Sequence, residues 1–393
     1  MLAACVTFVI KIALVVGSFG FLILVHELGH FVVARWSGVR ILRFSIGFGR
    51  RLCSWKRGET EYWVSMIPLG GYVKMAGEQH AEQSHEPGEY LSKPVGVRAA
   101  IILAGPAVNY LTAIVIMWLV FCIGFPELSP VIGEVKEGMP AFAAGVKTGD
   151  RVQQINGQAV RTWDEVTKLI QAAPDQAVQL AIERAGQTQM LTVRPKAEDA
   201  TDPFGTRKRV GRIGVSPNGD LWLRRTGPLA AIGQSLRQTT EWSVLTLQGL
   251  ASMVQHKVPF KESVSGPIGI GMLTWDAVTH LITQVFGRIP TQGLSALVSQ
   301  EVALALVHLL ILISLVSLGL AIFNVFPIPI LDGGHLLFLA IEKIRRGRPV
   351  SMVVQERVTQ VSFVLLMTLV AFICVNDIER FGIAKKVLEW VHR

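Results

Sequence analysis

The sequence predicts a polytopic α-helical membrane protein with about four transmembrane helices. Half of its 393 residues are hydrophobic and only 17% are charged, whereas about a quarter of the residues in a soluble domain are charged. The mean hydropathy is +0.44. Four apolar segments approach the roughly 20 residues that a helix needs to cross a hydrocarbon core of ~30 Å. They cover approximately residues 6–34, 99–125, 302–326 and 358–375.

The basic residues indicate how these helices are oriented. They gather in short stretches beside the apolar segments, and not along an aromatic-rich surface. The formal charge of +9 therefore indicates which loops are cytoplasmic, and no nucleic-acid partner is predicted. The stretches after the first and third segments contain Arg35, Arg40, Arg43, Arg50, Arg51, Lys56 and Arg57, and Lys343, Arg345, Arg346 and Arg348. By the positive-inside rule both connections are cytoplasmic. Residues 126–301 and both termini are then expected outside.

The first apolar segment raises the question of a cleavable signal peptide. It is longer than a signal peptide and contains the chain's main chemical motif, so we expect it to be retained.

The four cysteines are scattered, and none forms a C-x-x-C pair. No disulfide framework or cysteine-based zinc site is predicted.

A small antiparallel β-sheet is expected between the first two apolar segments. Residues 41–75 alternate β-formers with turns at Gly47-Phe48-Gly49, Arg57-Gly58 and Leu69-Gly70-Gly71, as in short antiparallel strands. The sheet begins a few residues after the first helix. It is therefore predicted to be membrane-associated, and the polar residues 76–94 are predicted to form a loop.

A small α/β domain is expected after the second apolar segment. A strand at 131–135 precedes the capping-box pattern Thr162–Glu165, which predicts a helix to about Ala173. Two further strands, about 177–184 and 189–195, flank the turn sequence Ala185-Gly186. A polar linker is expected at 196–212, and an amphipathic surface helix at 228–255.

The predicted organisation has eight parts. They are a first transmembrane helix (1–35), a cytoplasmic-side membrane-associated sheet and loop (36–98), a second transmembrane helix (99–125), an extracytoplasmic α/β domain (126–217), a linker with the amphipathic helix (218–301), a third transmembrane helix with a polar motif (302–340), a cytoplasmic loop (341–357), and a fourth transmembrane helix with a C-terminal tail (358–393).

The strongest chemical motif lies in the first apolar segment. His26-Glu27-Leu28-Gly29-His30 has the H-E-x-x-H spacing, which places two imidazoles on one helix face for a zinc ion and a carboxylate where it can act as general base. Ionisable groups in a membrane helix cost about 2.5–3.5 kcal/mol each on insertion scales, and a bound metal is the simplest compensation. The alternative is that the helix ends near Val25 and these residues lie in interfacial water.

A catalytic zinc needs a third protein ligand and one open position. The soluble continuation of the motif, a third histidine six residues on, is absent because Trp36 occupies that place. Asp332 is the candidate, since it follows Pro327 and Pro329 and precedes Gly333 and Gly334 at the end of the third apolar segment. Such a helix break is tolerated in a membrane where it is buried in protein or lines a watery cavity. An ordinary helix end followed by a turn is the alternative.

These motifs together resemble the site-2 protease family of intramembrane zinc metalloproteases, and within it the regulator of sigma-E type. The resemblance covers essentially the whole chain. Its motifs are His26–His30, Gly47-Phe48-Gly49, Pro68–Met75, Gly105-Pro106-Ala107 with Asn109, Ser265-Gly266-Pro267-Ile268, Asn324, and Leu331–Glu342.

The resemblance implies the roles of individual residues. His26, His30 and Asp332 would bind one Zn²⁺ per chain, and Glu27 would be the general base. Asn324 would help to hold the substrate. An unwound substrate could add as a strand to the sheet edge, where the residues expected to contact it are Gly70, Gly71, Tyr72 and Val73.

The resemblance also implies a setting. Residues 126–217 resemble a PDZ domain, which would act as a size filter in preference to capturing peptide tails. Relatives of this type commonly carry two tandem PDZ domains, whereas this chain has room for one clear copy, so it is expected to belong to a single-PDZ branch. Expected substrates are single-pass membrane proteins: anti-sigma factors already cut by another protease, and leftover signal peptides. The protein would act in the bacterial inner membrane, in the envelope stress response, with both termini and the PDZ domain periplasmic.

Other functions remain open from the sequence. One is a membrane-anchored PDZ adaptor with a non-catalytic metal site, although a structural zinc needs no Glu27 and favours four protein ligands. A transporter is less favoured, because no second broken helix is evident.

Two histidines and a carboxylate also bind iron(II), although the H-E-x-x-H spacing favours zinc. Asn109 and His308 suit interhelical hydrogen bonds, and His335 is left out of the metal shell.

Overall fold

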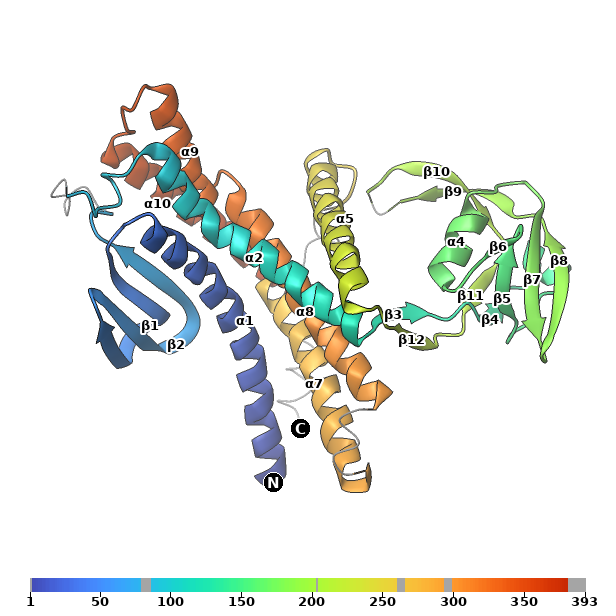
Figure 1. The fold of residues 1–393 in the computed structure, drawn as a ribbon. Coiled ribbons are helices and arrows are strands. Elements are labelled where there is room, and N and C mark those ends of the chain that lie inside the picture. The colour runs from blue at the N-terminus through green and yellow to red at the C-terminus, as the bar shows by residue number, and fades with distance from the viewer. Residues whose placement is uncertain (1, 79–85, 203, 260–265, 293–298, 381–393) are drawn as a thin grey trace. The chain divides into compact units, whose positions relative to one another are not determined.

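The computed structural model describes residues 2–78, 86–202, 204–259, 266–292 and 299–380. The chain divides into two compact units (Figure 1). The first unit comprises Met1–Val120, Ile232–Ser243 and Val264–Arg393, and the second comprises Phe121–Ala231 and Val244–Ser263.

Four long apolar helices dominate the first unit. They are α1 (Leu2–Trp36), α2 (Val95–Ile123), α8 (Gln300–Val325) and α10 (Met352–Arg380). Within the described residues, these four helices contain a stretch long and apolar enough to cross a membrane, which agrees with the number of transmembrane helices that the sequence predicts. Helix α1 continues to Trp36, which rules out a helix end near Val25.

Polar contacts between small residues hold α2 and α8 together. Ser314 and Ser317 of α8 are buried and donate hydrogen bonds to the carbonyl oxygens of Ala113 and Asn109, at 3.0 and 2.8 Å. Interhelical hydrogen bonds of this kind are common where apolar side chains cannot drive association in lipid. They place the middle of α2 firmly beside α8.

The segment predicted as a linker holds two long helices instead of one. Helix α5 (Pro228–Val254) agrees with the predicted amphipathic helix, and α7 (Pro267–Gln292) was not predicted. Helix α7 packs against α1 and α8 through a cluster of apolar side chains. This cluster contains buried Val278, Ile282 and Leu309, with Ile10, Val15, Ala277, Leu281 and Ile313 packed around them. Its apolar stripe is interrupted by threonines, Asp276 and His280, which hid the helical period.

The third predicted helix is broken, as the prolines and glycines indicated. Helix α8 ends at Val325, and α9 (Asp332–Ile344) begins seven residues later. A Cβ on Gly333 would lie 2.1 Å from the Phe326 carbonyl oxygen, and one on Gly334 would lie 2.3 Å from Pro329 Cα. Only glycine fits at either position. The segment 302–340 is thus two helices, and the loop predicted at 341–357 is reduced to residues 345–351 because α9 and α10 extend into it.

Two long bent strands form the predicted sheet. They are β1 (Ile41–Arg57) and β2 (Thr60–Met75), joined by a turn at Gly58 and paired antiparallel. Residues 43–46 have Cα partners on both sides, at Gly71–Lys74 and at Glu61–Val64. Gly47 and Gly49 have φ values of +89° and +85° and lie at the register shift, so they bend β1 and do not end it. The stretch 71–75 is left at the edge of the sheet.

The second unit contains the predicted α/β domain. A four-stranded sheet has the order β6 (Gln158–Ala159), β5 (Arg151–Ile155), β7 (Val178–Arg184) and β8 (Gln187–Val193). The capping box of helix α4 (Trp163–Gln171) is present, with both of its hydrogen bonds between Thr162 and Glu165. Val166 and Ile170 of this helix are buried in the domain core. The predicted hairpin turn at Ala185-Gly186 is confirmed, both residues having positive φ.

Three two-stranded ribbons complete the second unit. Strand β4 (Ile132–Val135) pairs with β11 (Val215–Pro217), and β3 (Phe125–Leu128) pairs with β12 (Leu221–Arg224). The third ribbon, β9 (Lys196–Thr201) with β10 (Arg207–Arg212), corrects the predicted linker at 196–212. The residues of this ribbon alternate between charged and small side chains, so they lack the apolar pattern by which a strand is predicted from sequence. The short helix α3 (Pro140–Ala143) follows β4.

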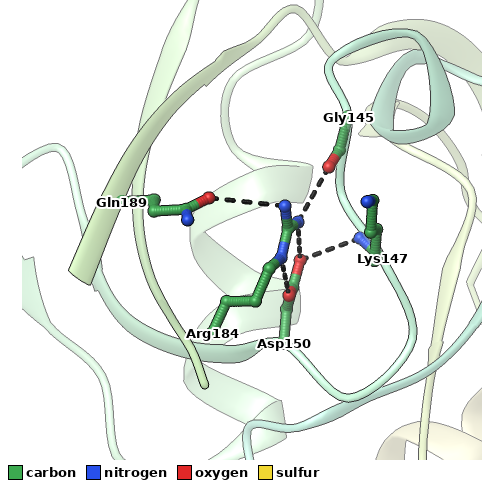
Figure 2. Close-up of polar contacts among 5 residues, drawn as sticks. All are labelled: Gly145, Lys147, Asp150, Arg184 and Gln189. Atoms are coloured by element: carbon green, nitrogen blue, oxygen red, sulfur yellow. Dashed lines mark hydrogen bonds and ion pairs between the residues drawn. The ribbon is translucent and has the colours of Figure 1, made fainter. Parts of the chain in front are cut away.

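A buried carboxylate anchors the loop before β5 (Figure 2). Asp150 is 1% exposed and accepts two hydrogen bonds from Arg184 at 2.7 Å, and a third from the backbone N–H of Lys147 at 2.8 Å. Arg184 also donates to the carbonyl oxygen of Gly145 and to the side chain of Gln189. Burial alone raises the pKa of Asp150, but Arg184 and the Lys147 N–H outweigh it and hold this pKa below its usual value.

We predict that Asp150→Asn loosens this domain. The ionised carboxylate is stabilised in the folded state, so its contribution is complete above the unfolded pKa of ~3.9 and is lost as the pH falls through the lower folded pKa. Hydrogen–deuterium exchange of the full chain should show faster exchange in β7 and β8 of the variant at pH 7. Asp199→Asn, at an exposed position of β9, is the control, and equal exchange in the two variants would contradict the prediction.

Candidate metal centre

Three ligand-type atoms from two distant helices meet in the first unit. His26 Nε2 lies 3.0 Å from Asp332 Oδ2, His30 Nε2 lies 3.6 Å from the same oxygen, and the two Nε2 atoms are 3.2 Å apart. The histidines belong to α1, and Asp332 is the first residue of α9. Within the described residues, this is the group of three metal-ligand side chains that lies close enough to share an ion.

Helix α2 fixes the orientation of both imidazoles. His30 Nδ1 is 2.8 Å from the carbonyl oxygen of Ile101. Because a carbonyl only accepts, Nδ1 carries the proton and Nε2 keeps its lone pair. His26 Nδ1 is 3.2 Å from the side-chain amide of Asn109, which is fully buried.

The amide of Asn109 completes the same arrangement at His26. With its nitrogen toward His26, the amide oxygen Oδ1 has no hydrogen-bond partner although it is buried. Turning the amide over pairs Oδ1 with the Nδ1–H of His26 and puts Nδ2 in the former place of Oδ1, and the two amide orientations occupy the same volume. Nε2 of His26 is then unprotonated, as it is in His30.

This protonation pattern calls for a cation. Two imidazole lone pairs and a carboxylate oxygen converge with no proton left to place between them, and Asp332 Oδ2 is buried without a hydrogen-bond partner. A buried unsatisfied carboxylate oxygen is costly. His26, His30 and Asp332 would hold a divalent ion through two nitrogens and one oxygen, which would remove that cost; a catalytic zinc takes three protein ligands of this kind. The residues therefore fit a catalytic type of metal site.

Two glycines allow α1 and α2 to approach closely at this point. A Cβ on Gly29 would lie 2.4 Å from the carbonyl oxygen of Ala104, and one on Gly105 would lie 2.4 Å from His30 Nε2 and 2.8 Å from His26 Cε1. Any side chain at residue 105 would therefore occupy the space of the imidazoles. This contact explains the glycine at residue 105 of the Gly105-Pro106-Ala107 motif.

Glu27 lies between the metal cluster and the sheet edge. Its carboxylate is within interaction range of the backbone N–H of Val73, and its Cγ would be 3.3 Å from a Cβ on Gly71. The same Cβ on Gly71 would also lie 2.7 Å from the carbonyl oxygen of Ser45. The absence of a side chain at Gly71 thus lets strand 71–75 pass between β1 and Glu27.

A cavity of about 690 Å³ opens from the cluster. Its lining includes His26, Glu27, His30 and Asp332, the edge residues Tyr72 and Val73, and the polar residues Glu342, Gln355 and Glu356. Tyr90 also lines it, and burial raises the pKa of Tyr90 so that it remains a neutral phenol. The site is therefore accessible to water and to a peptide backbone.

Most of the residues predicted for the site come together, but Gly70, Gly71 and Asn324 do not join the cavity lining. Gly70 packs instead against the ring of Phe48, and its φ of +135° requires glycine. Asn324 lies in the last turn of α8, eight residues before Asp332. His335 lines the cavity but is not in the ligand cluster. The interhelical hydrogen bond predicted for Asn109 is formed with His26, a proposed metal ligand, and no sequence pattern indicates that partner.

The chain is similar to known proteins over most of its length. The profile described as Peptidase family M50 matches residues 14–369. The regulator of sigma-E protease RseP of Escherichia coli (strain K12) is 30% identical over 482 aligned residues, covering 95% of this chain and 99% of that protein. Protease RseP of Yersinia pestis is 31% identical, with 94% and 98% covered. A Rhizobium meliloti (strain 1021) protein whose name ascribes zinc metalloprotease activity to it is 34% identical, with 91% and 93% covered.

Two further details come from these comparisons. The alignment with the Escherichia coli protein is longer than the 393 residues of this chain, so that protein has segments with no counterpart here. The PDZ domain of an SdrC-like protein from Listeria innocua matches with 20% identity and a TM-score of 0.19, covering 23% of this chain and 96% of that one.

We predict that Gly105→Ala lowers the affinity for a divalent metal by at least ~10-fold, as loss of support for a ligand commonly does. The added methyl group would push both imidazoles out of place. Gly96→Ala is the matched control, because it lies on the same helix and a Cβ there would have no atom within 4 Å. Competition with a metal chelator in detergent measures both. Equal affinities would show that the helix contact tolerates a larger residue.

Proposed function

This chain belongs to peptidase family M50 and is a zinc metalloprotease, and we propose that it hydrolyses peptide bonds within the transmembrane helices of single-pass membrane proteins. The observation that carries this proposal is the position of the cluster. His26, Glu27 and His30 lie inside an apolar helix long enough to span a membrane. A protease with its site there acts most directly on peptide bonds at membrane depth.

Each site residue has a proposed role that follows from its chemistry. His26, His30 and Asp332 hold the zinc ion, which when bound lowers the pKa of a ligated water and polarises a carbonyl group. Glu27 takes a proton from the attacking water and passes it to the leaving amine. Asn109 and the Ile101 carbonyl keep the two imidazoles in the tautomer that binds metal.

The sheet edge is the proposed binding site for the substrate backbone. A helix must unwind before its carbonyl groups can be attacked, and an extended strand can then pair with residues 71–75. This placement is supported by Tyr72 and Val73, which line the cavity beside Glu27. Asn324 is proposed to contact the substrate backbone farther along its path.

Orientation and biological role also belong to the proposal. Basic residues after the first and third spans favour a cytoplasmic sheet and an extracytoplasmic α/β domain in a bacterial inner membrane. Both termini would then be periplasmic. Substrates would be anti-sigma factors that another protease has already cut, or remnant signal peptides. The PDZ-like domain would exclude uncut substrates by size.

The first test is the variant Glu27→Gln. Wild type and variant, purified in detergent, should each hold about one zinc ion per chain, because Glu27 is not a ligand. Cleavage of a single-pass model substrate should fall by at least ~100-fold in the variant, since it loses its general base. If wild type binds zinc and cleaves no trimmed substrate, a membrane-anchored PDZ adaptor becomes the better account.

A second test addresses the proposed size filter. Residues 129–220 can be replaced by a short Gly-Ser linker without removing the β3–β12 ribbon, because Leu128 and Leu221 are paired at its end. We expect this variant to cleave substrates with an intact extracytoplasmic domain that wild type rejects, and to cleave trimmed substrates as wild type does. Continued rejection of untrimmed substrates would count against the filter.

A further inference from the structure

A buried ion pair joins the two helices that flank the metal cluster. Arg98, in the first turn of α2, donates from Nη2 to Glu342 Oε1 in the last turn of α9, at 2.5 Å. The two side chains are 9% and 11% exposed. Arg98 also donates from Nε to the Lys93 carbonyl oxygen at 3.1 Å, which fixes the direction of its guanidinium group.

Arg98 lies on the same stripe of α2 that organises the histidines. Residues 98, 101, 105 and 109 are spaced by three and four along the helix, so they share one face. Ile101 holds His30, Gly105 makes room for both rings, and Asn109 holds His26. Arg98 extends this stripe to α9 through its hydrogen bond to Glu342.

Helix α9 needs an anchor of its own. The break at residues 326–331 separates it from α8, so the helical rigidity of α8 does not extend to Asp332. Asp332 and Glu342 are at opposite ends of α9, about 15 Å apart at 1.5 Å per residue. They belong to the cavity-lining face, with His335, Phe338 and Leu339 between them. Fixing Glu342 therefore limits both the rotation and the sliding of the helix that carries Asp332.

The energetics of such a pair favour a geometric role. Removing two charges from water costs about as much as their attraction returns, so a buried ion pair is weak evidence for added stability. A bidentate-capable guanidinium group is directional, however, and defines where its partner must be. One helix would then set the positions of all three ligands: the histidines through Ile101 and Asn109, and Asp332 through Glu342.

We propose that Arg98 and Glu342 are positioning residues that place Asp332 against His26 and His30. This inference rests on the proposed metal site. It assigns to the pair no contact with substrate and no part in proton transfer. Its consequence is that the pair controls metal affinity and ligand geometry, although neither residue touches the metal.

The test measures the metal centre directly. Full-length Glu342→Gln and Arg98→Gln variants in detergent are compared with wild type by zinc competition against a chelator and by the visible absorption spectrum of the Co²⁺-loaded protein. Lys343→Gln, at the exposed neighbouring position of α9, is the matched control. We expect each variant of the pair to bind zinc at least ~10-fold more weakly, in the range seen for supporting residues, with an altered Co²⁺ spectrum. The control should match wild type in both.

Further variants separate positioning from folding. The apolar pair Arg98→Met with Glu342→Leu should fold, since such replacements of buried ion pairs are tolerated, yet it should bind zinc weakly. The exchanged pair Arg98→Glu with Glu342→Arg should recover part of the lost affinity. Wild-type zinc affinity in the folded apolar pair would overturn the inference. So would a loss confined to Arg98→Gln, because Glu342 would then not be needed.

Failure of this inference is distinct from failure of the proposed function. If wild type binds no zinc in the same assay, the proposed metal site itself is wrong. If wild type binds zinc, His26→Ala releases it, and the variants of the pair retain it like wild type, only the positioning role of Arg98 and Glu342 is wrong.

Discussion

The convergence of three electron-pair donors in an apolar setting is the constraint on which the rest of this structure depends. His26, His30 and Asp332 present unprotonated atoms to one another within hydrogen-bonding distance or slightly beyond it. Without a cation they would repel, and the buried oxygen of Asp332 would be unsatisfied. The same three atoms form a favourable site once a divalent ion is bound. The arrangement around the cluster can be understood as the means of keeping these groups in place.

Helix α2 does most of this positioning. It offers no proposed ligand, yet a single stripe of its residues reaches each of the three: Asn109 and Ile101 contact the histidines, and Arg98 is tied to the helix of Asp332. Because Gly105 has no side chain, this helix can pack directly against both imidazoles. The serines of α8 in turn hold α2 through its carbonyl groups. Rigid support of this kind is needed because metal affinity depends on small displacements of the ligands.

The sheet and the helix break bring a substrate to that site. Gly71 allows strand 71–75 to lie against Glu27, so the proposed binding edge and the proposed general base are neighbours. The break between α8 and α9 ends a helix at the place where a carboxylate must face inward. Both features depend on glycines at which a Cβ would collide with backbone atoms, and in both the missing side chain permits a close approach of the chain.

The sequence by itself determined what depends on neighbouring residues along the chain. Spacing of four in a helix places His26 and His30 on one face, prolines and glycines interrupt the helix before Asp332, and Thr162 with Glu165 starts α4. These are local effects, and they gave the four apolar helices, the motif at the site and much of the α/β domain. Only the tertiary structure decided what depends on residues far apart. The bond between Asn109 and His26 and the pair of Arg98 with Glu342 join residues separated by 83 and 244 positions, and α7 packs against the distant α1. No local period or propensity encodes such contacts, because they arise when separately formed helices meet and their buried polar groups find partners.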